Sequence, residues 1–305
     1  MKKSVILLLV LCLFVSVLSG CVVIEDQPLS NGNNDAVTNE TSGSQDDNGN
    51  INSDSSNNAV TVEETELYND NNVIVTVTGI EEHALMGPQI KLRLDNNTDK
   101  NITLTGDNFV VNGVTMYGLM SIDVAAGKKA NGEITLYSSE LELSGIKKIA
   151  TVSCNDAQFY DSDSYETLFD ISLNIETSIA VDYQQQIDET GDVLFQQDGI
   201  TVTVKKLETN LLGQAVILLI KNETGKEIIV NAENVSVNGY TIGGFLYDII
   251  CKDTVRFSSL DLMSSELEEN SITAVEEVTF SLEVLDADSY STITSTDELK
   301  VVVGE

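Results

Sequence analysis

The chain has 305 residues, and its 49 acidic side chains outnumber the 16 lysines and arginines, so the formal net charge is -33. This balance excludes a nucleic-acid-binding protein with a broad basic face, and it excludes attachment to anionic lipid headgroups by charge. Hydrophobic residues make up 42% of the chain, which is enough to build a core in each of about two domains.

The first 20 residues have the pattern of a signal peptide. Lys2 and Lys3 precede an apolar stretch, residues 5–18, which is shorter than the roughly 20 residues that a membrane-spanning helix needs. We therefore expect residues 1–20 to be a targeting segment, with a transmembrane anchor as the alternative.

The end of this segment, Leu18-Ser19-Gly20-Cys21, resembles the lipobox of bacterial lipoproteins. The resemblance implies cleavage just before Cys21 and a diacylglyceryl thioether on its thiol. It therefore implies a mature protein held by lipid on the extracellular face of the cell membrane. An ordinary secretory signal followed by a chance cysteine is the competing interpretation.

The next segment, residues 21–60, has the composition of a disordered linker. Between Asp26 and Val60 there are nine asparagines, no aromatic residue and neither lysine nor arginine. Such a segment has too little apolar surface to offset the entropy of ordering. We expect a flexible tether between the lipid and the folded part.

An internal repeat organises the rest of the chain. Residues 107–120 align with residues 233–246, and the sequence at 138–142 recurs unchanged at 264–268, at the same offset of 126. One offset maintained over this length predicts two copies of one domain. We place the two copies at residues 61–180 and 190–305, joined by the polar stretch 184–190.

Each copy has the patterns of strands. Residues 73–77 and 200–204 are rich in β-branched side chains. Alternating apolar residues follow in both copies, at Ile90, Leu92 and Leu94 and at Val216, Leu218 and Ile220. The second of these strands is apolar on both faces, which predicts a central strand or a covered sheet.

Turn and helix signals also recur. Asn112-Gly113 and Asn238-Gly239 each lie between apolar runs, as in a hairpin with a type I′ turn. Residues 138–143 and their counterparts predict a short helix, because a serine is followed three residues later by a glutamate as in a capping box.

About seven strands in each copy predict an all-β protein of two tandem antiparallel β-sandwiches of immunoglobulin type. A partly open barrel is the competing architecture. Val111-Asn112-Gly113 and the run at 125–132 resemble extracellular immunoglobulin-like modules of unknown function in lipoproteins of clostridia-like Gram-positive bacteria. The second copy departs from that run with Cys251-Lys252-Asp253-Thr254. The resemblance implies fold and location, and it transfers no catalytic residue.

The inventory of reactive side chains argues against an enzyme and against a bound cofactor. His83 is the single histidine, and we expect it in an exposed loop. No CxxC, HExxH or glycine-rich phosphate loop occurs. For Cys154 and Cys251 we expect two buried thiols, with a disulfide between them as the alternative.

The repeated Asp-Xaa-Asp-Ser-Tyr motif is the best candidate for chemistry. Asp161, Asp163, Asp286 and Asp288 could converge on calcium, but two carboxylates in each motif fall short of the about six to eight oxygen ligands that the ion takes. We therefore expect no metal. The favoured interpretation is a turn in which Asp and Ser cap backbone amides, with Tyr165 or Tyr290 packed on the edge of the sandwich.

These observations predict a non-enzymatic, monomeric cell-surface lipoprotein that serves as a binding, adhesion or accessory scaffold. Its expected partners are the membrane, through Cys21, and a protein or cell-wall glycan, but no nucleic acid. The acidic surface would either keep the exported module soluble and monomeric or attract a basic protein or peptide. The alternative is a solute-binding or sensing lipoprotein of a transport system. The copies differ most at 121–133 and 247–259, where we expect any difference in binding.

Overall fold

The structure is a computed structural model that describes residues 59–83 and 86–303. They belong to the second of two compact units, Asn57–Glu305. The predicted signal peptide, Cys21 and nearly all of the predicted linker lie outside the described residues. Among the helices that the structure describes, none is long and apolar enough to cross a membrane.

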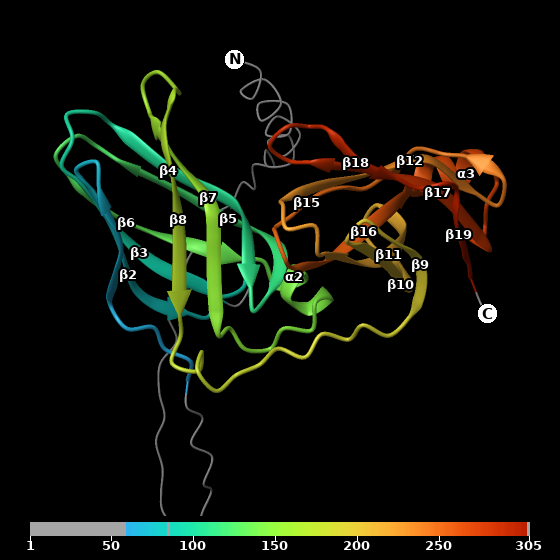
Figure 1. Cartoon of the computed structure of the whole chain (residues 1–305), viewed down its shortest axis with the longest axis horizontal. Coiled ribbons are helices and arrows are strands. Elements are labelled where there is room, and N and C mark those ends of the chain that lie inside the picture. Colours follow the sequence, from blue (N-terminus) through green and yellow to red (C-terminus); the bar gives the residue numbers. More distant parts are fainter. Residues whose placement is uncertain (1–58, 84–85, 304–305) are drawn as a thin grey trace, which may run out of the picture. The chain divides into compact units, whose positions relative to one another are not determined.

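The first copy is built from eight antiparallel strands in two layers (Figure 1). They are β1 (Thr65–Asp70), β2 (Val73–Glu81), β3 (Gln89–Asn96), β4 (Ile102–Val111), β5 (Val114–Val124), β6 (Lys129–Leu136), β7 (Thr151–Asp161) and β8 (Thr167–Glu176). The hydrogen-bonded order is β1-β2-β3-β6-β5-β4-β7-β8, because β5 pairs with both β6 and β4. A single strand therefore joins the two layers.

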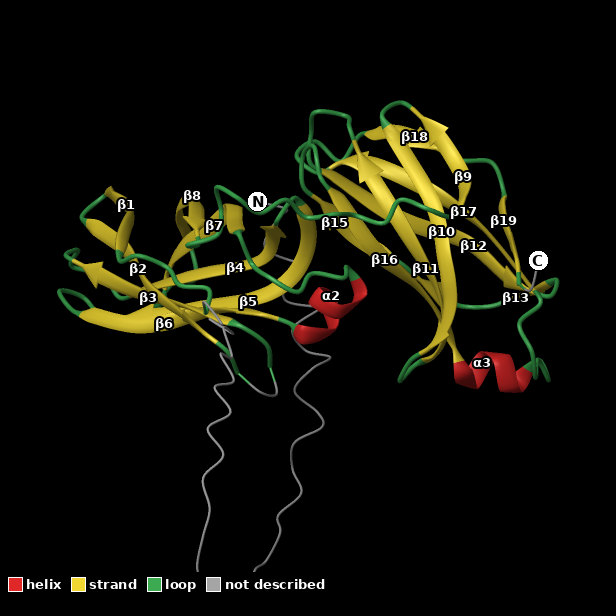
Figure 2. Ribbon diagram, turned by 90° about the horizontal axis from the view of Figure 1, so that it is seen from below, coloured by secondary structure: helices red, strands yellow, loops and turns green. Residues whose placement is uncertain are grey.

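The second copy has the same arrangement with one strand divided (Figure 2). Its strands are β9 (Asp192–Gln197), β10 (Ile200–Thr209), β11 (Gly213–Asn222), β12 (Ile228–Val237), β13 (Tyr240–Thr241), β14 (Gly244–Phe245), β15 (Tyr247–Ile250), β16 (Val255–Met263), β17 (Glu277–Asp286), β18 (Thr292–Ser295) and β19 (Leu299–Val302). One layer has the order β9-β10-β11-β16-β14, and the other is built on β12 and β17.

Three short strands, β13, β14 and β15, replace β5 in the second copy. Between β13 and β14, where the strand is interrupted, Gly243 and Gly244 occupy the positions of Tyr117 and Gly118 in the first copy. A Cβ atom on Gly243 would lie 2.6 Å from Oε1 of Glu266. The glycine therefore allows the chain to pass close to the following helix.

Each copy has its own hydrophobic core between its layers. Phe109 and Phe159 are fully buried in the first core, and Phe280 is fully buried in the second. Leu219 of β11 and Val255 of β16 pack with the core of the first copy. The prediction for β11 is confirmed: the strand lies between β10 and β16, and both of its faces are covered.

The predicted fold class is confirmed at the level of an all-β protein with sandwich-like layers. The first copy also has the continuous strand path of the competing, partly open barrel. Its end strands approach each other through Tyr68 of β1 and Phe169 of β8, whose ring centroids are 6.1 Å apart. The domain boundaries stay a prediction.

Both predicted hairpin turns are present. Asn112 and Gly113 have φ of 51° and 86°, and Asn238 and Gly239 have φ of 51° and 82°. Both residues of each turn are thus in the left-handed region that a type I′ turn requires.

The two predicted helices also form, as α2 (Ser138–Leu143) and α3 (Ser264–Glu269). The predicted capping box is wrong. Tyr137 and Met263 occupy the N-cap positions, and neither makes a side-chain capping hydrogen bond. In α3, the hydroxyl of Ser264 instead donates to the carbonyl of Leu212, 3.0 Å away, and so holds the loop between β10 and β11.

Candidate functional site

The two copies meet at a seam where their sheets become continuous. Strand β16 pairs with β5 in the parallel direction at Val255 and Val114, and the amide of Val255 donates to the carbonyl of Gly113 at 3.3 Å. Beside this contact, the hydroxyls of Thr115 and Thr254 are 2.7 Å apart. Thr115 is 1% exposed and Thr254 is 9% exposed, so the seam is closed to solvent here.

These threonines form a closed hydrogen-bond loop with Cys251. The hydroxyl of Thr254 donates to the carbonyl of Cys251 at 2.7 Å, and the amide of Cys251 donates to the hydroxyl oxygen of Thr115 at 3.1 Å. The hydroxyl of Thr254 has one hydrogen, and it donates that hydrogen to the carbonyl of Cys251. The hydroxyl of Thr115 must therefore be the donor in the bond between the two threonines. The loop therefore needs a hydroxyl on each copy.

Arg256 is the centre of the seam. Only 2% of Arg256 is exposed, and its guanidinium lies 3.9 Å from the ring centroid of Tyr117 in the first copy. Its Nε is 3.1 Å from a carboxylate oxygen of Asp248, and its Nη2 is 3.8 Å from Glu140 of α2. Neither Nε nor Nη1 has an aligned hydrogen-bond partner among the described residues. Two carboxylates and an aromatic face therefore hold this cation mainly by charge.

The electrostatics keep this arrangement charged at neutral pH. Burial lowers the pKa of Arg256, but the negative charges of Asp248 and Glu140 oppose it, and the net shift is upward. Burial and the charge of Asp248 raise the pKa of Tyr117. Its phenol therefore stays neutral and donates to the carbonyl of Tyr247, 3.3 Å away.

The ion pair is a difference between the copies. At the offset of 126, Arg256 corresponds to Ala130 and Asp248 to Ile122, which is 3% exposed in the first core. Both members of the pair belong to the stretch in which the two copies diverge most. The structure places part of that divergence in the contact between the copies, a role that the sequence did not predict.

Half-buried Glu227 also lies close to this contact, beside Cys251. Burial, followed by the negative charge of Asp156, raises the pKa of Glu227 to about 6. Asp156 belongs to the first copy, at a bulge of β7 between Cys154 and Ala157. The two carboxylates repel each other across the seam.

The repeated aspartate motif forms turns, as the favoured interpretation predicted. In the first copy, Asp161 accepts the amides of Asp163 and Ser164 at 3.0 and 3.2 Å and pairs with Lys100 at 2.8 Å. The hydrogen bond from Lys100 is the main reason why the pKa of Asp161 is lowered.

The motif in the second copy repeats these contacts. Asp286 accepts the amides of Asp288 and Ser289, both at 3.0 Å, and pairs with Lys226 at 2.6 Å. In residues 59–83 and 86–303, no group of three or more His, Cys, Asp or Glu side chains could hold a metal ion.

The prediction for the tyrosines of this motif is wrong. Tyr165 is 82% exposed and Tyr290 is 51% exposed. Their φ values are 59° and 56°, because each donates its amide back to the carbonyl of the aspartate and closes the turn in the left-handed region. This conformation directs both rings toward solvent rather than onto the sandwich edge.

The predictions for the histidine and the cysteines are confirmed as far as exposure is concerned. His83 is exposed, and its Nδ1 accepts the amide of Met86 at 3.3 Å. Cys154 and Cys251 are free thiols, 1% and 4% exposed. Burial raises the pKa of the Cys251 thiol to about 12, so the protonated thiol is unreactive at neutral pH.

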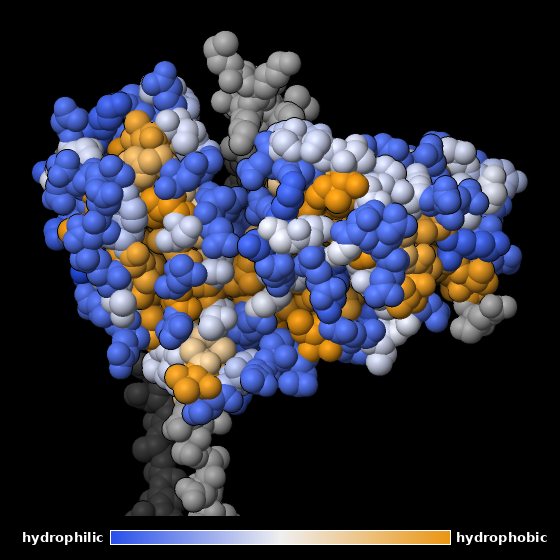
Figure 3. Space-filling view, viewed as in Figure 1, coloured by the Kyte–Doolittle hydropathy of each residue, from blue (hydrophilic) through white to orange (hydrophobic). Residues whose placement is uncertain are grey.

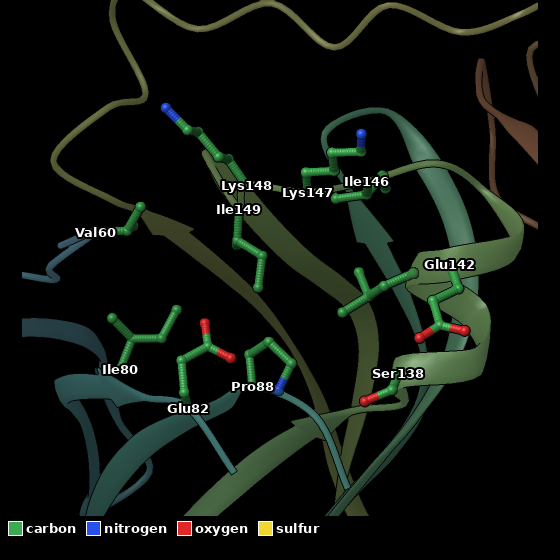
Figure 4. Close-up of a pocket in the computed structure, with 11 residues that line it drawn as sticks. Val60, Ile80, Glu82, Pro88, Ser138, Glu142, Ile146, Lys147, Lys148 and Ile149 are labelled. Atoms are coloured by element: carbon green, nitrogen blue, oxygen red, sulfur yellow. The ribbon is translucent and has the colours of Figure 1, made fainter. Parts of the chain in front are cut away.

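An open cavity of about 220 Å³ lies between α2 and the ends of β2 and β3 (Figure 4). Ile80, Pro88 and Ile149 give it an apolar centre, and Glu82 extends into it, whereas the amino groups of Lys147 and Lys148 point outward. Drug-sized ligands occupy clefts of about 300–1,000 Å³. This cavity therefore fits a single side chain better than a small-molecule substrate.

Comparison with known proteins adds little. No protein-family model and no curated protein matches the chain. The crystal structure of a conserved domain protein from Bacillus anthracis is similar over 79% of this chain and 92% of its own, with 13% sequence identity and a TM-score of 0.28. A similarity at this TM-score supports no conclusion about fold or function.

Proposed function

We propose that this chain is a non-enzymatic, monomeric cell-surface lipoprotein whose two immunoglobulin-like domains act as a binding, adhesion or accessory scaffold. The strand order supports the immunoglobulin-like part. The orders β2-β3-β6-β5 and β5-β4-β7-β8 correspond to the two sheets of that fold, with β5 shared between them and β1 added at one edge. The order β10-β11-β16-β14 repeats the first sheet in the second copy.

The single observation that carries the scaffold function is the seam between the copies. A solute-binding lipoprotein needs two lobes that open and close around a cleft. Here a backbone hydrogen bond, the threonine loop and the buried Arg256 all connect the copies, and a hinge motion would have to break them. Such a connection favours a body that presents its loops and strand edges at a constant spacing.

The surface fits this role. On the face shown in Figure 3, hydrophilic residues predominate, and separate apolar areas interrupt them over both copies. Together with the net charge of -33, such a surface favours a soluble module that is attracted to basic partners.

Two experiments test the proposal. Metabolic labelling with a fatty-acid analogue should label the wild-type protein but not the Cys21→Ser variant, which should appear in the medium. The chain without its signal peptide and lipid, immobilised on beads, should retain a protein or glycan from cell-surface extracts reproducibly. Label on Cys21→Ser, or beads that retain nothing above blank beads, would contradict the corresponding part of the proposal.

A further inference from the structure

The outer face of the second copy carries a row of apolar side chains across three neighbouring strands. Ile229 of β12 pairs with Ile249 of β15 on one side and with Leu285 of β17 on the other. These side chains point away from the core, since they alternate with Val230, Ile250 and Val284, which belong to it. The row therefore lies outside the core between the layers; Ile229 at its centre is buried, whereas Ile249 and Leu285 are partly exposed.

The first copy has polar residues at the same register. Thr103 of β4 pairs with Asp123 of β5 and with Tyr160 of β7. The hydroxyl of Thr103 donates to Asp123 at 2.6 Å and lies 2.9 Å from the hydroxyl of Ser162. Because the same fold forms with a hydrogen-bonded polar row, the apolar row of the second copy is not a requirement of the fold.

Two tyrosines extend this row on the surface. Tyr247 precedes Ile249 by two residues on the same face of β15 and is 40% exposed, and Tyr290 is 51% exposed in the turn after β17. The two are near enough for Tyr290 to raise the pKa of Tyr247, after the larger effect of burial. We call the four accessible residues Tyr247, Ile249, Leu285 and Tyr290 the apolar strip; Ile229, between them, is only 2% exposed.

Acidic residues border the apolar strip. Glu283 lies two residues before Leu285 on the same face of β17 and is partly exposed. Asp288 is exposed in the turn that leads to Tyr290. The nearby Lys226 is already paired with Asp286. An apolar centre with a negative border is complementary to a segment that combines apolar and positively charged side chains.

We propose that the apolar strip is a docking site for a basic protein segment that carries aliphatic or aromatic side chains between lysines and arginines. Apolar side chains of the segment cover Ile249 and Leu285, its cations face Glu283 and Asp288, and an arginine can stack on an exposed tyrosine ring. A second copy of this chain is a poor occupant, because its own charge of -33 would bring like charges together. The inference rests on the proposed scaffold function and names its partner.

The first test uses a fluorescent synthetic peptide of about ten alternating lysine and leucine residues, titrated with the full mature chain at about 0.15 M salt. A peptide with glutamate in place of lysine is the charge control. We expect the lysine peptide to bind and the glutamate peptide not to bind. In the presence of the lysine peptide, hydrogen exchange should slow in β15 and β17.

Matched variants assign the site. Tyr290→Ala should weaken binding about fivefold, and the double variant Ile249→Thr/Leu285→Thr should weaken it more than tenfold. Tyr165→Ala, at the equivalent turn of the first copy, should leave the affinity unchanged, and circular dichroism verifies that each variant is folded. Equal affinity of all variants, or equal binding of the glutamate peptide, would overturn the proposal, since the attraction would then come from the overall charge.

The bead experiment with cell-surface extracts, done with both the wild type and the Ile249→Thr/Leu285→Thr variant, tests the apolar strip separately from the scaffold function. If the wild type retains a partner and Ile249→Thr/Leu285→Thr loses it, both are supported. If both proteins retain the same partner, the scaffold function stands and the apolar strip is refuted as its site. If neither retains anything, the scaffold function and the strip fail together.

Discussion

Arg256 and Asp248 form an ion pair that the first copy does without. Moving two charges out of water costs several kcal/mol for each ion, and their attraction repays this cost only when both partners are present. The intact pair therefore adds little to the free energy of unfolding. Replacing only one of its residues, however, leaves an unpaired buried charge and is strongly destabilising. Tyr117 and Glu140 of the first copy also contact Arg256, so the environment of this buried charge depends on both copies.

Removing one partner of this pair should be much worse than removing both. Asp248→Ala leaves the guanidinium with only the more distant Glu140, and we expect the free energy of unfolding to fall by about 3–5 kcal/mol. The double variant Arg256→Met/Asp248→Leu should be within about 1 kcal/mol of the wild type. Urea denaturation measures both, with the exposed Asp297→Ala as the control. A single variant as stable as the control would show that the ion pair has no structural role.

Glu227 should make stability fall as the pH rises from about 5 to 7. Its pKa in the folded state, about 6, is above the ordinary value of 4.5, so the folded state holds the proton more tightly than the unfolded chain does. Ionisation therefore destabilises the folded state. Glu227→Gln should be more stable than the wild type by about 1 kcal/mol at pH 7, discounted for its partial exposure. The advantage should vanish below the ordinary pKa of 4.5. Thermal unfolding across this range measures it, and a constant difference would contradict the assignment.

At the scale of single elements, the two Asn-Gly turns do more than reverse the chain. Oδ1 of Asn112 accepts the amides of Ala150 and Thr151 at 2.8 and 3.0 Å, which ties the hairpin to β7. Asn238 makes the same contacts with Glu276 and Glu277 in the second copy. An aspartate also tolerates the turn geometry, but only the amide can in addition donate, as Asn112 does to the carbonyl of Lys148 at 2.7 Å.

Asn112→Ala should therefore cost more than Gly113→Ala. The first loses two accepted hydrogen bonds as well as the turn preference, and we expect a loss of about 2–3 kcal/mol in the free energy of unfolding. Gly113 has φ of 86°, but a Cβ atom at this position would meet no other atom within 4 Å. Its substitution therefore costs only the backbone strain, about 1 kcal/mol. Urea denaturation of both variants, and of the matching variants at Asn238 and Gly239, measures which substitution lowers the free energy of unfolding more. The reverse order in both copies would show that turn geometry outweighs the side-chain hydrogen bonds.

Local patterns predicted most elements of the sheets. Alternation and the Asn-Gly dipeptides were sufficient for the strands and hairpins, because these depend on residues that are near in sequence. The same reasoning failed for Tyr165 and Tyr290, whose orientation is determined by how the turn closes on its aspartate. It also missed the division of β5 in the second copy, because the contact of Gly243 with Glu266 joins residues 23 positions apart.

At the scale of the whole described chain, the seam should make the two copies unfold together. Leu219 and Val255 of the second copy are part of the first core, so unfolding of either copy exposes apolar surface of the other. The polar stretch 184–190 contacts both copies: Nδ2 of Asn112 donates to Oε1 of Gln185 at 3.4 Å, and Nζ of Lys205 donates to the carbonyl of Asp188 at 2.9 Å. The copies therefore share stabilising contacts rather than merely following each other in sequence.

Calorimetry should show one unfolding transition for the wild type and two for a chain with a weakened seam. Tyr117→Ala removes the ring that covers Arg256, and Thr115→Val breaks the hydroxyl loop, so the combined variant should unfold in two separate steps. Tyr160→Ala, a substitution of similar size on the outer face of the first copy, is the control and should keep one transition. Two transitions in the wild type would show that the seam does not couple the copies.

The sequence by itself determined the all-β class, the doubling at an offset of 126, the turns, the exposure of His83 and the burial of the two cysteines, because composition, periodicity and turn chemistry are local properties. The targeting segment and Cys21 remain predictions from sequence alone. Only the tertiary structure decided the roles of the divergent stretch at 247–259, part of which forms the seam and part the apolar strip. Those roles depend on which residues meet across strands and between copies, and pairing of residues far apart in sequence leaves no local pattern.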